Sequence, residues 1–158
     1  MPSEARRRLI LALEMASRLA GSVGIFKIGK QLLTAEGPEA VRNLSRFDLG
    51  IFLDLKFHDI PNTVAGAVSA ACSLPGFAFL TVHALGGRAM MNAASLAAVT
   101  AHSPPHARPK VLGVTLLTSP YAAVMREIRL TGTPVTRAVH LARLARRGKL
   151  DGVVASPK

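Results

Sequence analysis

The chain has 158 residues, and 49% of them are hydrophobic, enough to bury the core of one domain, so that intrinsic disorder is excluded. Lysine and arginine outnumber aspartate and glutamate by 20 to 9, and the net charge of +11 favours anionic partners such as phosphorylated ligands. Only 4% of the residues are aromatic and none is tryptophan, which argues against stacking on nucleic acid bases and therefore against RNA or DNA as the main partner.

Short runs of β-branched and aromatic residues alternate with longer segments rich in alanine, leucine and arginine. This alternation is typical of repeated strand–helix units around a parallel sheet. The chain begins with a predicted helix at Ser3–Leu19, which ends at Gly21. Five predicted strands follow, at Gly24–Ile28, Leu49–Leu55, Phe79–His83, Val111–Leu117 and Gly152–Ala155. Five further helices are predicted at Pro38–Arg46, Pro61–Cys72, Gly87–Val99, Pro120–Leu130 and Val135–Arg147.

The predicted strands are almost entirely apolar, as expected for a parallel sheet that is covered on both faces. No linker rich in proline, glycine or serine divides the chain, so we predict a single α/β domain over residues 1–158. A closed barrel of eight strand–helix units takes about 250 residues. An open sheet, in turn, needs protected edges. The strand count alone leaves both architectures open.

The single cysteine, Cys72, has no partner for a disulfide or for a cysteine-based zinc site, and we interpret it as a small buried apolar residue. We therefore expect a reducing, cytoplasmic compartment. The apolar run Leu9–Leu13 is too short to span a bilayer, and charged residues at Glu14 and Arg18 follow it. We predict neither a targeting segment nor a membrane partner.

The densest group of polar residues is Asp54–Thr63, with the sequence DLKFHDIPNT. Residues two apart on a strand point to the same face, so Asp54 and Lys56 are predicted to lie side by side at the carboxyl end of the second strand. In parallel α/β folds this end of the sheet binds ligands. Lys27 occupies the equivalent position one strand earlier, and Asp59 lies in the following loop.

Two lysines and two aspartates at one rim of a sheet have no net charge, which makes their partial burial tolerable. Such a network can keep a lysine protonated as a general acid and can place a carboxylate against a substrate anion. For an isolated Asp-x-Lys the alternative is an ion-paired rim without chemistry. The length of the polar string favours a catalytic site.

The string DLKFHDIPNT resembles the signature of bacterial orotidine 5′-phosphate decarboxylase, the last enzyme of de novo UMP synthesis. Further matches occur in the family's order from Gly21 to Ser156. They are FKIG at 26–29, TAEGP at 34–38, VHA at 82–84, GG at 86–87, VTLLTS at 114–119 and LDGVV at 150–154. The resemblance implies an incomplete (β/α)8 TIM barrel with about five parallel strands, which acts as a homodimer without metal or organic cofactor.

Carried over to this sequence, the resemblance implies that Lys27, Asp54, Lys56 and Asp59 form a Lys-Asp-Lys-Asp tetrad that decarboxylates orotidine 5′-phosphate to UMP. Asp54 would press electrostatically on the substrate carboxylate. Lys56 would protonate the pyrimidine carbon as carbon dioxide leaves. Lys27 would orient the network and touch the ribose.

The resemblance also assigns residues that bind substrate or cross between subunits. Asp59 and Thr63 would reach into the site of the neighbouring subunit, so that dimerisation becomes part of catalysis. Thr118 and Ser119 would hold the pyrimidine. His83 ends a strand at the same rim, where we predict a hydrogen-bonded histidine rather than a catalytic one.

Two parts of the family pattern have no match in this sequence. The family's first strand ends in an aspartate that binds ribose, and the nearest counterpart here is Glu14, inside the predicted helix Ser3–Leu19. The family's last two strand–helix units, which include a Gly-Arg phosphate clamp, have no counterpart before Lys158. We therefore expect these 158 residues to turn over substrate more slowly than a full barrel.

Three other functions are consistent with parts of the sequence. A related lyase that acts on sugar phosphates shares an Asp-x-Lys-x-x-Asp core but uses magnesium. An inactive fragment that serves only as a dimerising scaffold would retain the same motifs. A basic nucleic-acid binder would use the positive charge, although the arginines at 137, 143, 146 and 147 are predicted to form a solvated helix face.

The histidines His102 and His106 have the spacing of a metal-binding pair only if they lie on a helix. Prolines lie between them, so no metal site is predicted there.

Overall fold

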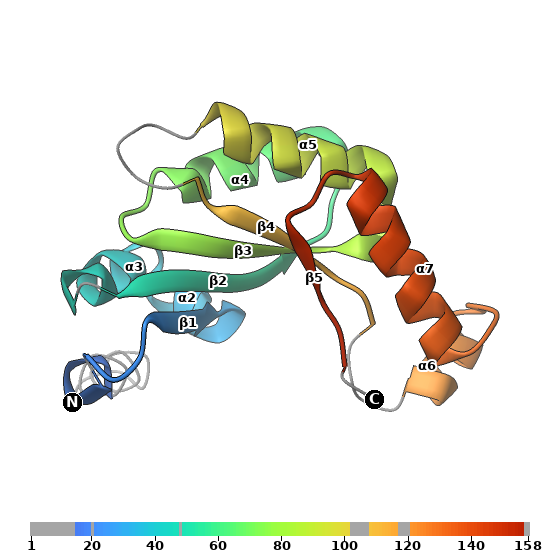
Figure 1. Cartoon of the computed structure of the whole chain (residues 1–158), viewed down its shortest axis with the longest axis horizontal. Helices are drawn as coiled ribbons and strands as arrows, with labels where there is room; N and C mark the ends of the chain where they lie inside the picture. Colours follow the sequence, from blue (N-terminus) through green and yellow to red (C-terminus); the bar gives the residue numbers. More distant parts are fainter. Residues whose placement is uncertain (1–14, 20, 48, 102–107, 117–120, 157–158) are drawn as a thin grey trace.

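The computed structural model describes residues 15–19, 21–47, 49–101, 108–116 and 121–156 (Figure 1). Its five strands form one parallel sheet in sequential order, which confirms the predicted α/β class and strand–helix repeat. The strands are β1 (Ile25–Gly29), β2 (Gly50–Phe57), β3 (Phe77–His83), β4 (Lys110–Val114) and β5 (Gly152–Val154). Each predicted strand is present, and no end of a strand is shifted by more than three residues.

Helices connect consecutive strands. They are α2 (Lys30–Glu36), α3 (Glu39–Leu44), α4 (Pro61–Cys72), α5 (Gly87–Thr100), α6 (Tyr121–Glu127) and α7 (Pro134–Arg147), with 3-10 turns η1 (Ser45–Phe47) and η2 (Ala84–Gly86). The predicted helix Ser3–Leu19 is described only at residues 15–19, which are helical. None of the described helices is both long and apolar enough to cross a membrane.

Helix α2 was not predicted from the sequence. It starts directly after β1 and ends at Gly37, whose φ of +63° lies in the left-handed region that glycine favours. It has seven residues, and none of them is buried. Without a buried apolar face, α2 lacks the periodicity by which a helix is recognised in a sequence.

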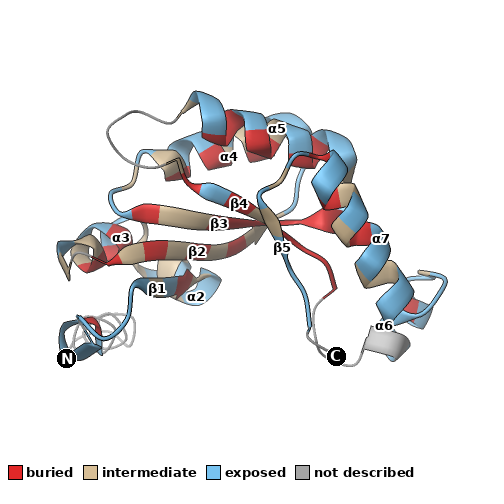
Figure 2. Ribbon diagram, viewed as in Figure 1, coloured by how far each residue is buried: buried red, intermediate tan, exposed pale blue. Residues whose placement is uncertain are grey.

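The hydrophobic core lies between the sheet and the helices α4 and α5, which run side by side along one face of the sheet (Figure 1). Pro61, with its fixed φ, starts α4 at a position where no intrahelical hydrogen bond is lost. The buried surfaces of α4 and α5 face the sheet while their outer surfaces are exposed (Figure 2). The largest fully buried side chains include those of Ile51, Leu53, Val68, Leu80, Met90 and Met91.

Burial alternates along β2, which corrects the expectation that both faces of the sheet are covered. Ile51, Leu53 and Leu55 are buried, whereas Asp54 and Lys56 on the other face are only partly buried. Phe52 on that face is also only partly buried, and at the end of the strand the charged groups keep contact with solvent or ligand. The face of β2 opposite the core therefore carries the polar residues.

An ion pair ties the amino ends of β4 and β5 together. The Arg108 guanidinium donates two hydrogen bonds to the Asp151 carboxylate, one of them at 3.0 Å. The same carboxylate accepts the backbone N–H of Val111 at 2.8 Å. Burial alone would raise the pKa of Asp151, but the hydrogen bonds from Arg108 and Val111 outweigh it and hold that pKa below its usual value.

We expect Asp151→Asn to lower the free energy of unfolding at pH 7 by about 1–2 kcal/mol, because a charge-assisted pair is lost. A lowered folded-state pKa stabilises the fold above the unfolded-state pKa of about 3.9, and this contribution fades as the pH falls through the folded-state value. The difference between variant and wild type should therefore shrink in acid. Urea unfolding at pH 7 and near pH 3 measures both quantities.

The control is Glu39→Gln, which removes an exposed ion pair with Arg42 on the surface of α3. Such surface pairs contribute little, so this variant should match the wild type at both pH values. An equal loss of stability in Asp151→Asn at both pH values would show that the ionised carboxylate is not the source of the effect.

Candidate functional site

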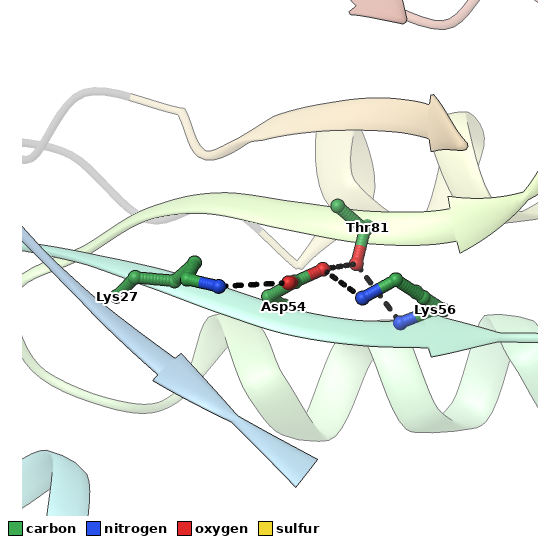
Figure 3. Close-up of polar contacts among 4 residues, drawn as sticks. All are labelled: Lys27, Asp54, Lys56 and Thr81. Carbon is green, nitrogen blue, oxygen red and sulfur yellow. Dashed lines mark hydrogen bonds and ion pairs between the residues drawn. The ribbon is translucent and has the colours of Figure 1, made fainter. Parts of the chain in front are cut away.

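Four polar side chains from three neighbouring strands meet near the carboxyl end of the sheet (Figure 3). Lys27 comes from β1, Asp54 and Lys56 from β2, and Thr81 from β3. The register explains the meeting. Leu53 pairs with Leu80, so that Asp54 and Thr81, which follow this pair, lie at one level. Lys27 pairs with Phe52, two residues before Asp54 on the same face of β2.

The Asp54 carboxylate lies between the two lysines and uses both of its oxygens. Lys56 Nζ is 2.7 Å from Asp54 Oδ1, and Lys27 Nζ is 3.3 Å from Asp54 Oδ2. The Asp54 and Lys56 side chains are 16% and 26% exposed, whereas that of Lys27 is 60% exposed. The Lys56 ammonium is thus held in place, while Lys27 retains contact with solvent.

Asp54 and Lys56 do meet as predicted, but the strand is not regular between them and the start of the loop. Leu53 pairs with Leu80, and the next pair is Phe57 with Val82, so three residues of β2 lie opposite a single residue of β3. Within this bulge Lys56 has a φ of +50°, in the left-handed region. The alternation of side chains along a regular strand therefore predicted the contact between Asp54 and Lys56 correctly, but it did not predict the bulge in which Lys56 lies.

Thr81 is the member of the cluster that sequence reasoning missed. Its side chain is buried, and its hydroxyl donates a hydrogen bond to Asp54 Oδ1 at 3.1 Å. The Thr81 hydroxyl oxygen also accepts the backbone N–H of Lys56 at 2.9 Å. The available signal was a lone hydroxyl in an otherwise apolar stretch of strand, two residues before His83.

The cluster is electrostatically arranged to keep Asp54 ionised. Burial alone would raise the pKa of Asp54, but hydrogen bonds and charge from Lys56, with hydrogen bonds from Lys27 and Thr81, outweigh it and lower that pKa. A carboxylate with this environment is negatively charged at neutral pH. An anionic group of a ligand placed beside it would be repelled by Asp54 and attracted by the lysines.

Two histidine rings stack next to the cluster. The rings of His58 and His83 have centroids 5.4 Å apart at an angle of 20°. Burial, followed by the charges of His58, Lys30 and Lys56, lowers the pKa of His83. A neutral ring fits the observed contact, in which Nδ1 of His83 accepts the backbone N–H of Leu85 at 3.3 Å. The predicted hydrogen bond of His83 at the strand end is confirmed.

Asp59 and Thr63 lie apart from the cluster, beyond the end of β2. The Asp59 carboxylate accepts the backbone N–H of Ile60 at 2.6 Å and has no hydrogen bond to Lys27, Asp54 or Lys56, all of which are described. Thr63 is exposed in the first turn of α4. An open hollow of about 550 Å³ beside Asp59 is lined by His58, Asp59, Ile60, Pro61, Leu85 and Gly86.

Several predicted site residues fall on parts of the chain that the structure does not describe. Thr118, Ser119 and Glu14 lie outside the described residues, as do His102 and His106. Among the residues that are described, no three histidine, cysteine or acidic side chains are grouped so as to hold a metal ion. The roles assigned to Thr118, Ser119 and Glu14 stay predictions.

Comparison with protein families gives one match over most of the chain. The model of the "Orotidine 5'-phosphate decarboxylase / HUMPS family" matches residues 8–158. Among curated proteins, an orotidine 5′-phosphate decarboxylase of Syntrophotalea carbinolica is 47% identical, over 98% of this chain and 67% of its own length. One from Geobacter sulfurreducens is 44% identical, over 98% of this chain and 68% of its own length. The chain thus spans about two thirds of these relatives.

Solved structures give the same result for the fold. The orotidine 5′-phosphate decarboxylase of Lactobacillus acidophilus superposes with a TM-score of 0.79 at 36% identity, over 91% of this chain and 66% of the other. The five parallel strands and their helices therefore correspond to part of the TIM barrel of these proteins.

Proposed function

This chain belongs to the orotidine 5′-phosphate decarboxylase / HUMPS family, and we propose that it carries out the decarboxylation of orotidine 5′-phosphate to UMP in pyrimidine biosynthesis. The observation that carries the proposal is the Lys27–Asp54–Lys56 cluster, in which an ionised carboxylate is held between two ammonium groups at the ligand-binding end of a parallel sheet. The names of the relatives support the choice of substrate.

The proposed chemistry moves negative charge from the substrate carboxylate to carbon 6 of the pyrimidine. The bond between that carbon and the carboxylate breaks, carbon dioxide leaves, and the electron pair stays on the ring carbon. Lys56 Nζ supplies the proton that forms the new C–H bond, and solvent later returns a proton to the amine. Asp54 would repel the carboxylate in the ground state, whereas the Lys56 ammonium would stabilise the charge that develops on carbon.

The remaining polar residues would position the substrate. Lys27 would orient Asp54 through Oδ2 and, being 60% exposed, could contact the ribose. Thr118 and Ser119 would hold the pyrimidine. The resemblance to the family implies that no metal ion or organic cofactor takes part.

We propose that the active form is a homodimer in which Asp59 and Thr63 complete the site of the partner subunit. In support, Asp59 makes no hydrogen bond or ion pair with Lys27, Asp54 or Lys56 of its own chain, all of which are described. Beside it, Ile60 is 65% and Leu85 is 40% exposed, as suits apolar side chains that another subunit covers.

The proposed location is the cytoplasm. The single cysteine, half-buried Cys72, is consistent with the reducing environment of that compartment.

The test is release of carbon dioxide from carboxyl-labelled orotidine 5′-phosphate by the purified chain, with UMP formation measured in the same samples. We expect one UMP per carbon dioxide, at a rate that added EDTA does not change. Complete absence of both products would refute the proposed function. Activity that EDTA removes and magnesium restores would instead favour the metal-dependent sugar-phosphate lyases.

A further inference from the structure

Thr81 forms hydrogen bonds with both Asp54 and Lys56, the residues to which the decarboxylation chemistry is assigned. We propose that Thr81 is a positioning residue that holds the left-handed backbone at Lys56 and the orientation of the Asp54 carboxylate, and thereby fixes the direction in which the Lys56 ammonium is presented. As a statement about catalysis, this inference rests on the proposed function. As a statement about geometry, it stands on the contacts of Thr81 alone.

The Thr81 hydroxyl uses both of its hydrogen-bonding capacities inside the cluster. Its hydrogen is donated to Asp54 Oδ1 at 3.1 Å, and its oxygen accepts the N–H of Lys56 at 2.9 Å. Thr81 is 0% exposed, so the hydroxyl makes these bonds away from solvent. Asp54 Oδ1 is also the oxygen that Lys56 Nζ contacts at 2.7 Å. One side chain therefore contacts both the backbone of Lys56 and the acceptor of its ammonium group.

The bulge in β2 explains why a hydroxyl is needed at this point. Between the Leu53–Leu80 and Phe57–Val82 pairs the ladder is interrupted, and Lys56 adopts a φ of +50° that is unfavourable for a residue with a Cβ atom. A backbone N–H in such a place requires another acceptor. The Thr81 oxygen supplies it and so compensates for the irregular backbone.

The sequence of β3 indicates that packing alone does not require a threonine at position 81. The strand reads FAFLTVH, so that Thr81 carries its only hydroxyl, and valine would fill the same volume with equal preference for a strand. What valine lacks is the hydroxyl that bridges Asp54 and Lys56. The substitution Thr81→Val therefore separates positioning from packing.

The experiment compares Thr81→Val with Thr81→Ser, which keeps the hydroxyl, and with Ser95→Ala as a matched control. Ser95 is also buried, and its hydroxyl donates to the Lys149 carbonyl at 2.8 Å, on helix α5 and away from the cluster. We expect Thr81→Val to lower kcat by roughly ten- to a hundredfold, as for a misplaced catalytic group, with little change in KM. Thr81→Ser should restore most of kcat, and Ser95→Ala should leave it unchanged.

A second readout does not depend on turnover. Carbon-13 NMR of the Asp54 carboxyl group gives its titration midpoint in each variant, and the Lys56 amide resonance reports its hydrogen bond. Loss of a hydrogen bond to the ionised form raises a carboxyl pKa, so the Asp54 midpoint should rise in Thr81→Val and not in Thr81→Ser or Ser95→Ala. If Thr81→Val does not fold, Thr81→Ala serves in its place.

The outcomes separate this inference from the proposed function. If the wild-type chain releases no carbon dioxide, the proposed function fails, and the NMR comparison alone decides the role of Thr81. If the wild type is active and Thr81→Val keeps its kcat, the positioning role is overturned. An Asp54 midpoint and a Lys56 amide resonance unchanged by Thr81→Val overturn it as well.

Discussion

Replacing Lys56 with alanine is expected to reduce the rate of decarboxylation by about a thousandfold or more, as for the loss of a general acid that also stabilises charge. The Lys56 ammonium is the proposed proton donor and the group that contacts Asp54 Oδ1 at 2.7 Å. Alanine is preferred to glycine for the test because it keeps a Cβ atom at the φ of +50°, so the backbone cost stays the same. Carbon dioxide release from labelled substrate measures the effect.

The control for Lys56→Ala is Lys110→Ala, which removes an exposed lysine from the first position of β4, at the other end of the sheet. Both variants should keep the circular dichroism and the cooperative unfolding of the wild type, and Lys110→Ala should keep its rate as well. A near-normal rate in Lys56→Ala would disprove the assignment of Lys56 as proton donor.

Mixing two inactive variants is expected to restore activity if Asp59 completes the partner's site. In a dimer of one Lys56→Ala and one Asp59→Ala subunit, one of the two sites receives both an intact Lys56 and an intact Asp59. Random mixing makes about half of the dimers mixed, so about a quarter of the wild-type activity should return. The measurement is the decarboxylation rate after the two variants are unfolded together and refolded.

The matched control for this mixing experiment is Lys56→Ala combined with Asp54→Ala. These residues contact each other within one chain, so every mixed dimer still has a defect in each site and no activity should return. Recovery in this control pair would mean that subunit mixing does not report shared sites. No recovery with the Asp59 pair would place Asp59 outside the partner's site.

The fold was largely predictable because its strands are short apolar runs that end at polar residues. Leu49–Leu55 and Phe79–His83, for example, correspond to β2 and β3. Helix α2 was missed because its seven residues present no buried face, and its limits are set by glycines at 29 and 37. The predicted covering of both sheet faces was incomplete at β2, where Phe52, Asp54 and Lys56 on the second face are only partly buried.

The candidate site was predictable only where spacing along one strand determines proximity. Asp54 and Lys56 are two apart, and their contact follows from that spacing even though a bulge alters the backbone between Leu53 and Phe57. Lys27 could be placed because equivalent ends of adjacent parallel strands meet. The contact of Thr81 depends on the register between β2 and β3 and on the bulge itself, which no local sequence pattern encodes.

Two ion-paired groups lie at opposite ends of the sheet. Arg108 and Asp151 join the amino ends of β4 and β5, whereas Lys27, Asp54 and Lys56 lie toward the carboxyl ends of β1 and β2. Conformational stability and chemistry are thus assigned to opposite ends of the same sheet, on different strands. This arrangement is favourable for laboratory evolution. Libraries in the loops that follow β2 and β3 can alter substrate preference while the Arg108–Asp151 ion pair between β4 and β5 stays intact.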